Sequence, residues 1–286
     1  MKGIIGVVVI LGVALNFSYK EFKKYENFND GLLHVYFLNI GQGDGFLIKT
    51  PDKKLILIDG GPNETVLFRL SKILPFWINQ IDLISISHFH RDHYLGAYYV
   101  KEFAQVNKIL YPDQFEQNDE LFILFDGFGA GEKNSQKYLN IRQDTEYRYG
   151  DNLSFKILAL ESDVKPISEN FESLMVYLNY KDFEVLFTGD APPSLQKAAQ
   201  SQLPKGGLEV LKVPHQGSKY DLYPSFIEYL SPEVAIVSIG QNSYGHPHKE
   251  VLDYYARQSI PLYRTDSANN YIMVKTDGQG YQVDCY

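Results

Sequence analysis

Residues 81–93 are Ile-Asp-Leu-Ile-Ser-Ile-Ser-His-Phe-His-Arg-Asp-His, a short apolar run that leads directly into three histidines and an aspartate. The apolar part, 81–87, predicts a buried strand. Because residues two apart in an extended chain point the same way, His88 and His90 could hold one metal ion together. A helix is expected from Tyr94, and the turn into it would bring Asp92 and His93 toward a second position. Imidazole and carboxylate ligands suit zinc, manganese or iron.

A solvated, histidine-rich loop is the alternative explanation for this cluster. The cluster holds three of the seven histidines of the chain, which weighs against that explanation. The single cysteine, Cys285, excludes a disulfide within one chain and a cysteine zinc cluster. Any metal ligands must therefore be His, Asp or Glu.

Alternating strands and helices are predicted on both sides of the cluster. We expect helices at 65–74, 94–106, 193–202, 224–230 and 250–258, and a helical piece near 133–138 in the otherwise unassigned stretch 113–150. We expect strands at 32–40, 46–49, 54–58, 81–87, 108–111, 153–158, 174–180, 183–188, 208–213, 234–239 and 271–275. This alternation predicts an α/β fold, but it allows both a doubly wound sheet and a sandwich of two sheets.

The N-terminal 30 residues have a different composition from the rest. Met1 and Lys2 precede an apolar run over 3–15, which is shorter than the roughly 20 residues that span a bilayer. We expect residues 1–17 to be a signal peptide or an N-terminal membrane anchor, 18–30 a polar linker, and 31–286 the folded domain. Ala14-Leu15-Asn16 fits a signal cleavage site poorly, which favours the anchor, and a buried first strand or helix is the alternative. The prediction is a secreted or membrane-anchored protein that faces outside the cytoplasm.

Six motifs in one order resemble the metallo-β-lactamase superfamily, and most closely the hydrolase domain of the ComEC-type competence proteins. The histidine cluster is the most specific of them, and the other five are weak alone but strong together. These five are the loop 38–45 (LNIGQGDG), 57–61 (LIDGG), 186–190 (LFTGD), 211–218 (LKVPHQGS) and 238–248, which ends in YGHPH. The resemblance implies a four-layer α/β/β/α sandwich that binds two divalent metal ions, zinc or manganese.

The resemblance also implies a ligand set. His88 and His90 would hold one metal. Asp92, His93 and His215 would hold the other, and Asp190 would bridge the two. A plain turn aspartate and a packed loop histidine are the competing explanations for Asp190 and His215.

Several further residues are supporting candidates. Asp59 would orient a ligand histidine from outside the ligand set, or it is a simple turn carboxylate. Gly41 and Gly43 would let the first loop run beneath the metals, supported by Asp44, although an ordinary hairpin loop explains them nearly as well. His246 and His248 could donate a hydrogen bond or a proton to the reacting group. They could equally be surface residues before a helix, and function is favoured only for His246.

Two departures from the family pattern affect this ligand set. No histidine lies between His93 and His215. Asn170 or Ser173 falls where another ligand is expected, so the site of His88 and His90 would be the weaker one. Gln216 stands where a second adjacent histidine is usual in the family.

These residues predict a hydrolase that uses a metal-bound hydroxide, with Asp92 also orienting the water and His246 as a further catalytic candidate. By resemblance we expect a phosphodiesterase or nuclease acting in the cell envelope or outside the cell, on DNA or a cell-wall component. The N-terminal segment would contact the membrane, and no obligate protein partner is evident. The net charge of −8 argues against general nucleic-acid binding. Lysines and arginines near the motifs could bind phosphate or be simply solvated: Lys212, Lys219, Lys249 and Arg264. The alternatives are a metal-poor binding protein tethered to the membrane and a hydrolase of non-phosphate esters or lactams.

Overall fold

Two large β-sheets form the centre of the protein in a computed structural model that describes residues 2–112, 138–161 and 169–286. The eight-stranded sheet has the order β17 (Tyr281–Cys285), β16 (Tyr271–Thr276), β1 (Leu33–Leu38), β2 (Gly45–Lys49), β3 (Leu55–Asp59), β5 (Leu83–Ser85), β7 (Ile109–Pro112), β8 (Tyr138–Ile141). The seven-stranded sheet has the order β15 (Leu262–Arg264), β14 (Val234–Val237), β13 (Val210–Lys212), β12 (Phe183–Phe187), β11 (Met175–Tyr180), β10 (Leu153–Leu158), β9 (Thr145–Tyr149). Two short strands, β4 (Gln80–Ile81) and β6 (Gln105–Val106), pair separately.

The main core lies between the two sheets, because alternate residues of each strand face inward. In β1, Val35 and Phe37 belong to this core, whereas Tyr36 and Leu38 face the helices on the other side. Phe37 and Phe46 of the first sheet meet Phe187 of the second, with ring centroids 5.8 and 5.0 Å apart.

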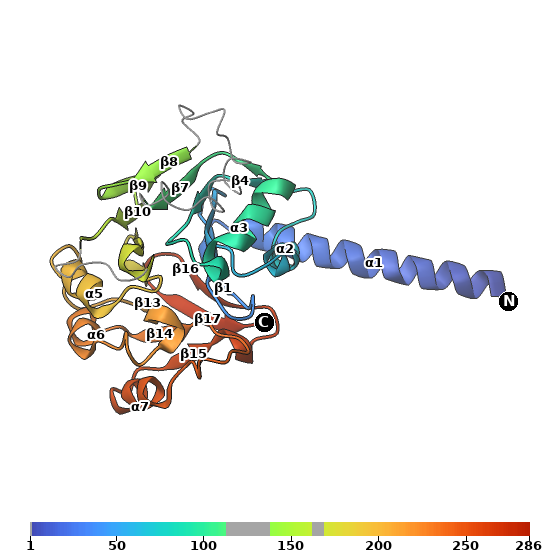
Figure 1. Cartoon of the computed structure of the whole chain (residues 1–286). Helices are drawn as coiled ribbons and strands as arrows, with labels where there is room; N and C mark the ends of the chain where they lie inside the picture. Colours follow the sequence, from blue (N-terminus) through green and yellow to red (C-terminus); the bar gives the residue numbers. More distant parts are fainter. Residues whose placement is uncertain (1, 113–137, 162–168) are drawn as a thin grey trace.

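Helices cover the outer faces of both sheets (Figure 1). The eight-stranded sheet packs against α2 (Thr65–Ile73) and α3 (Arg91–Phe103). The seven-stranded sheet packs against α5 (Pro193–Ala199), α6 (Pro224–Leu230) and α7 (Lys249–Arg257). The short 3₁₀ turns are η2 (Glu169–Glu172), η3 (Pro214–Gly217) and η4 (Thr265–Ser267). This arrangement confirms the predicted four-layer α/β/β/α sandwich.

The N-terminal segment forms one long helix, α1 (Lys2–Asn29), which projects from the domain (Figure 1). The stretch expected to be a linker therefore continues the helix. Residues 9–20 of α1 are exposed, so they are not a buried first element of the domain. Within the described part of the chain, no helix has the length and apolar character needed to cross a membrane.

Most other differences from the expected elements are local. The helix that was expected to follow the histidine cluster begins inside it, at Arg91, three residues earlier than predicted. The strand expected at 81–87 is interrupted at Asp82, whose carboxylate accepts a hydrogen bond from the Leu55 amide at 3.0 Å. Strands β8, β9 and β17 were not predicted. The helical piece expected near 133–138 lies outside the described residues, except that Tyr138 begins β8.

Candidate metal centre

Asp190 lies at the centre of the histidine cluster. It follows β12 through Gly189, it is almost fully buried, and its Oδ2 faces three imidazole Nε2 atoms. The distances are 3.8 Å to His88, 3.4 Å to His93 and 3.4 Å to His215. The motifs at 88–93, 186–190 and 211–218, which are far apart in the sequence, therefore meet at one carboxylate oxygen.

His88, His90 and Asp190 form one group that could hold a cation. Their candidate ligand atoms all lie within 4.8 Å of one another. His88 is fully buried after β5, and its Nε2 is 3.0 Å from Nδ1 of His90.

His93 and His215 each place Nε2 3.4 Å from Oδ2 of Asp190, and Asp92 adjoins His93. Because α3 begins at Arg91, Asp92 and His93 occupy its first turn and not a loop before it. Oδ2 of Asp92 is 3.9 Å from Nε2 of His93. The helix start is held by the first loop, since the Asp44 amide donates to the Asp92 carbonyl at 3.1 Å. Gly43 is needed there, because its φ is +121° and an added Cβ would lie 2.0 Å from that carbonyl oxygen.

Two carboxylates fix the orientation of the ligand histidines. Asp59 Oδ2 is 3.0 Å from Nδ1 of His93 and accepts from the Ser87 hydroxyl at 2.6 Å. Asp221 Oδ2 is 2.7 Å from Nδ1 of His215. Both contacts leave the Nε2 atoms turned toward Asp190. Asp59 thus lies where the sequence placed it, whereas Ser87 and Asp221 were missed, because no spacing rule connects them to the cluster.

A buried ion pair lies next to Asp190 and His93. Lys212 and Asp44 are both fully buried and form a close ion pair, and the lysine also donates to the Gly189 carbonyl at 2.8 Å. Lys212 is therefore neither solvated nor placed to bind phosphate. Asp44, His93 and Asp190 form a second group whose candidate ligand atoms lie within 4.8 Å of one another. Asp44 is thus part of the centre.

The local charges determine the protonation of these groups. Burial favours the neutral acid, yet the neighbouring His93, His88 and His215 hold the pKa of Asp190 well below its usual value. Burial opposes a charge on His93, but Asp190 and Asp59 hold the pKa of this histidine well above its usual value. Burial lowers the pKa of His88 well below its usual value, and the charge of His93 lowers it further.

These residues fit divalent cations. Oδ1 of Asp190 is buried and has no hydrogen-bond partner within the described ranges, and the Lys212 ammonium lies 3.8 Å from it. Several ring nitrogens point at Oδ2 of the same residue, and imidazole with carboxylate is the donor set that zinc and manganese take.

The two departures from the family pattern have structural counterparts. Asn170 has a buried Oδ1 with no hydrogen-bond partner in the described part of the chain, and its Nδ2 is 3.4 Å from Nδ1 of His215. Ser173 is buried, and its Oγ also has no partner there. Gln216 places its amide Nε2 3.1 Å from Asp92 Oδ2 and 3.3 Å from His93 Nε2. An amide NH₂ is a donor and not a metal ligand, so Gln216 hydrogen-bonds where the family usually has a histidine.

A cavity of about 350 Å³ opens over the centre. Its lining includes Asn170 and the side chains of the first turn of α3, among them Arg91, which is exposed and has no ion pair with any described residue. His246 also lines it, with its ring 5.5 Å from that of His215 and a buried Nδ1 to which no described residue hydrogen-bonds. His248 does not line the cavity, and its Nδ1 accepts from the Lys219 amide at 3.2 Å.

The other cations considered for phosphate are paired with carboxylates outside this cavity. Lys219 contacts Glu250, Lys249 contacts Asp253, and Arg264 contacts Asp266. The sequence patterns did not single out Arg91, although its place inside the histidine motif is a signal that could have been used.

Comparisons with known proteins bear on the family and the fold. The model of the metallo-beta-lactamase superfamily matches residues 38–130. ComE operon protein 3 of Bacillus subtilis (strain 168) is 29% identical over 252 residues, which cover 81% of this chain and 32% of that protein. Competence protein ComA of Neisseria gonorrhoeae is 28% identical over 236 residues, covering 79% and 30%. The chain thus spans about a third of the length of these curated relatives.

Solved structures share the fold at low identity. A candidate metal-dependent hydrolase from Parabacteroides distasonis ATCC 8503 superposes with a TM-score of 0.51 at 14% identity, covering 81% of this chain and 92% of that one. The CmlA beta-hydroxylase E377D mutant gives a TM-score of 0.53 at 12% identity, covering 85% and 54%. The family-model match and the sequence relatives show that the chain resembles the metallo-β-lactamase superfamily and, within it, the ComEC-type competence proteins, and the solved structures share its fold.

Proposed function

We propose that this protein hydrolyses phosphodiesters in a metal-dependent reaction. The superfamily is one of metal-dependent hydrolases, and the chain carries its motifs in order. The observation that carries the proposal is the convergence of three imidazole Nε2 atoms on Asp190, beneath a cavity whose lining includes Arg91. The Arg91 guanidinium forms no ion pair with the residues that the structure describes.

Two metal sites would share Asp190. His88 and His90 would hold one ion, and Asp92, His93 and His215 the other, with Asp44 close enough to take part. Bound divalent ions would supply an acidified water and would stabilise charge that develops on the phosphoryl oxygens. Asp59 and Asp221 keep the Nε2 atoms of their histidines turned inward, so the protein orients the ligands before the metals bind.

Arg91 and His246 would contact the substrate. Arg91 lies at the N-terminus of α3, where the helix dipole and the guanidinium both favour an anion. His246 faces the cavity from the opposite loop and could donate a hydrogen bond to the leaving oxygen.

The substrate class follows from charge. Lys212 is buried, and Lys219, Lys249 and Arg264 are paired with carboxylates, so Arg91 supplies the cation of the cavity among the described residues. One cation suits a single phosphodiester better than a long polyanion. We therefore favour a small or cell-wall phosphodiester over extended DNA, with the protein held at the cell envelope by α1.

A metal-supplemented activity screen tests this function. The purified chain is first freed of metal and then assayed with Mn²⁺ or Zn²⁺ on bis-p-nitrophenyl phosphate, single-stranded DNA, a phosphorylcholine ester and a β-lactam. We expect turnover of the phosphodiesters only with metal. Turnover of the lactam alone, or of no substrate, would overturn the proposal.

The position of Gln216 supports a second candidate function, that of a binding protein which has the hydrolase fold but no activity. Its amide hydrogen-bonds to Asp92 and contacts Nε2 of His93, which would compete with metal at that site. Metal analysis separates the two functions, because a binding protein would hold less than one ion per chain and stay inactive with added metal. If the protein only binds a ligand, Gln216→His should raise the number of metal ions bound per chain. If it is a hydrolase, the wild-type chain should already bind close to two ions.

A further inference from the structure

A group of exposed aromatic side chains lies on the side of the domain where helices cover the eight-stranded sheet, away from the metal centre. Phe76 and Trp77 follow α2, and Phe103 ends α3, with 69%, 48% and 72% of their surfaces exposed. Single exposed apolar side chains are common in proteins, but a group of large ones usually marks a contact surface. We call the surface of Phe76, Trp77 and Phe103 the aromatic face.

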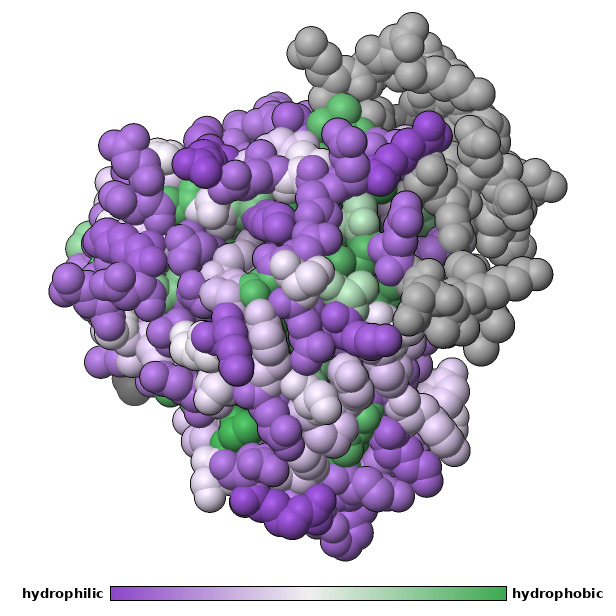
Figure 2. Space-filling view, turned by 90° about the vertical axis from the view of Figure 1, so that its left-hand side faces the viewer, coloured by the Kyte–Doolittle hydropathy of each residue, from purple (hydrophilic) through white to green (hydrophobic). Residues whose placement is uncertain are grey.

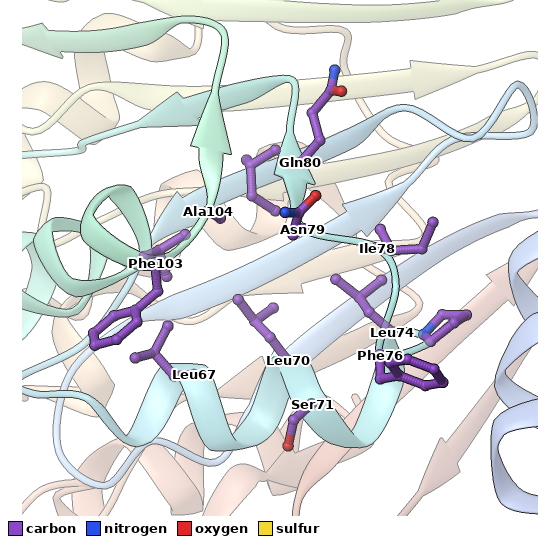
Figure 3. A pocket seen from close by; sticks show the side chains of 13 residues that line it. Leu67, Leu70, Ser71, Leu74, Phe76, Ile78, Asn79, Gln80, Phe103 and Ala104 are labelled. Atoms are coloured by element: carbon purple, nitrogen blue, oxygen red, sulfur yellow. The ribbon is translucent and has the colours of Figure 1, made fainter.

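An apolar hollow opens between these side chains. Its volume is about 290 Å³, and Phe76 and Phe103 stand at opposite sides of it (Figure 3). The lining is mainly aliphatic and comes from α2, α3 and the segment before β4: Leu67, Leu70, Leu74, Ile78, Ile81 and Val100. The hollow therefore extends the apolar surface inward.

Helix α1 is fixed next to the aromatic face. The Phe17 ring lies 5.9 Å from that of Phe76, and the Tyr25 ring lies 6.1 Å from that of Trp77. Polar contacts reinforce this packing, because Glu21 accepts from the Phe76 amide at 2.9 Å and Lys24 donates to the Ser71 carbonyl at 2.7 Å. The direction in which α1 leaves the domain is thus set by contacts with this face (Figure 1).

Residues 9–16 of α1, beyond these contacts, are exposed and mostly apolar. Residues 3–19 carry no charge, and Ile10 and Leu15 are each 70% exposed. The apolar surface is therefore continuous from the helix onto the aromatic face. The face turned away from α1 is mostly hydrophilic, with only scattered apolar residues (Figure 2).

The charges around this surface are positive on balance. Lys20 on α1 and Lys72 on α2 have no carboxylate partner among the described residues, and Lys72 lies 4.3 Å from the centre of the Phe68 ring. The acidic residues nearby are neutralised, since Glu21 pairs with Lys24, Glu26 with Lys23 and Glu102 with Lys101. Anionic lipid headgroups would complement this arrangement.

From these observations we propose that the aromatic face lies directly on a lipid surface. The apolar part of α1 enters the lipid, and its fixed packing brings Phe76, Trp77 and Phe103 to the headgroup level. Trp77 favours that level because its indole is apolar but carries a polar N–H, and phenylalanine is common on the apolar side of segments that lie in the interface. The occupant of the face is thus an anionic membrane surface, and the catalytic function is not needed for this inference.

Trp77 is the only tryptophan of the chain, so its fluorescence reports on this face directly. The full-length chain is mixed with vesicles of seven parts phosphatidylcholine to three parts phosphatidylglycerol, with or without lipids brominated near the carbonyl end of the acyl chain. We expect a blue shift on binding and at least twofold quenching by the brominated lipid. Flotation with the vesicles without a shift or quenching would overturn the proposal, because then α1 alone contacts lipid. Absence of flotation would overturn it as well.

A matched pair of variants separates the face from the helix. Phe76→Ser/Phe103→Ser keeps Trp77 and all of α1, and it should lower the bound fraction severalfold at limiting lipid and weaken the quenching. Tyr220→Ser removes an equally exposed ring elsewhere and should bind like wild type. Equal binding and quenching for both variants would refute the proposal. So would a concentration-dependent blue shift without lipid that accompanies dimer formation in sedimentation, because a second copy would then cover the face.

Discussion

Lys212→Met removes one partner of the most buried ion pair near the centre. Both Lys212 and Asp44 are fully buried, so loss of the ammonium leaves a carboxylate that water cannot reach. Breaking such a pair costs about 3–5 kcal/mol, mainly because the remaining carboxylate loses its closest opposite charge and keeps only the more distant His93 imidazole, 3.8 Å away. Burial already raises the pKa of Asp44 above its usual value, although Lys212 opposes this shift. The variant should therefore lose about that much free energy of unfolding.

Urea denaturation of the metal-free chain at pH 7, followed by circular dichroism, measures this loss. Lys49→Met is the matched control, because Lys49 is also buried but its partner Asp30 is about a quarter exposed and can be rehydrated. The double variant Asp44→Asn/Lys212→Met should recover part of the loss, since no charge is then stranded. If Lys212→Met costs no more than Lys49→Met, or the double variant recovers nothing, the reasoning about the buried pair is wrong.

Three further outcomes are expected. Arg91→Gln should raise KM for bis-p-nitrophenyl phosphate about tenfold with a smaller change in kcat, because the guanidinium would bind the phosphate. Lys249→Gln, an exposed control outside the cavity, should change neither KM nor kcat. An unchanged KM in Arg91→Gln would show that Arg91 does not bind the substrate. Asp221→Asn should weaken metal affinity about 10–100-fold in chelator competition, and unchanged affinity would show that His215 needs no orienting carboxylate. Burial lowers the pKa of His34 from 6.5 to about 4, so the unfolded chain takes up the proton first and stability falls as pH falls. The advantage of wild type over His34→Gln in free energy of unfolding should shrink by about 3 kcal/mol from pH 7 to pH 4, and a constant difference would contradict this.

The fold was predictable because its signals are local and repeated. The strands at 46–49, 54–58 and 174–180 and the helices at 65–74 and 224–230 have clear apolar periods, and each is close to an observed element. The edge strand Tyr281–Cys285 was missed because it is half-exposed and only partly apolar, so its place depends on pairing with β16. The start of α3 was misplaced because His90 precedes it without a side-chain cap that sequence could reveal.

The candidate site was partly predictable for the same reason. The cluster at 88–93 and Asp190, which follows β12, can be predicted from motifs within a few residues. The sequence could not pair Asp221 with His215, and it could not bury Lys212 beneath Asp190, because both depend on how β13 and its following loop pack against β12. In the sequence alone, Lys212 cannot be distinguished from a surface lysine, because its burial depends on the assembled sheet.

The most direct measurement is metal-dependent turnover of bis-p-nitrophenyl phosphate by the wild-type chain, Asp92→Ala and Asp190→Ala, with metal content determined in parallel. Circular dichroism shows that each variant is folded. The account predicts turnover by wild type that rises as the chain approaches two ions, and loss of turnover in both variants, with less metal bound by Asp190→Ala. Near-normal turnover in both folded variants, or wild-type turnover that does not depend on metal, would contradict it.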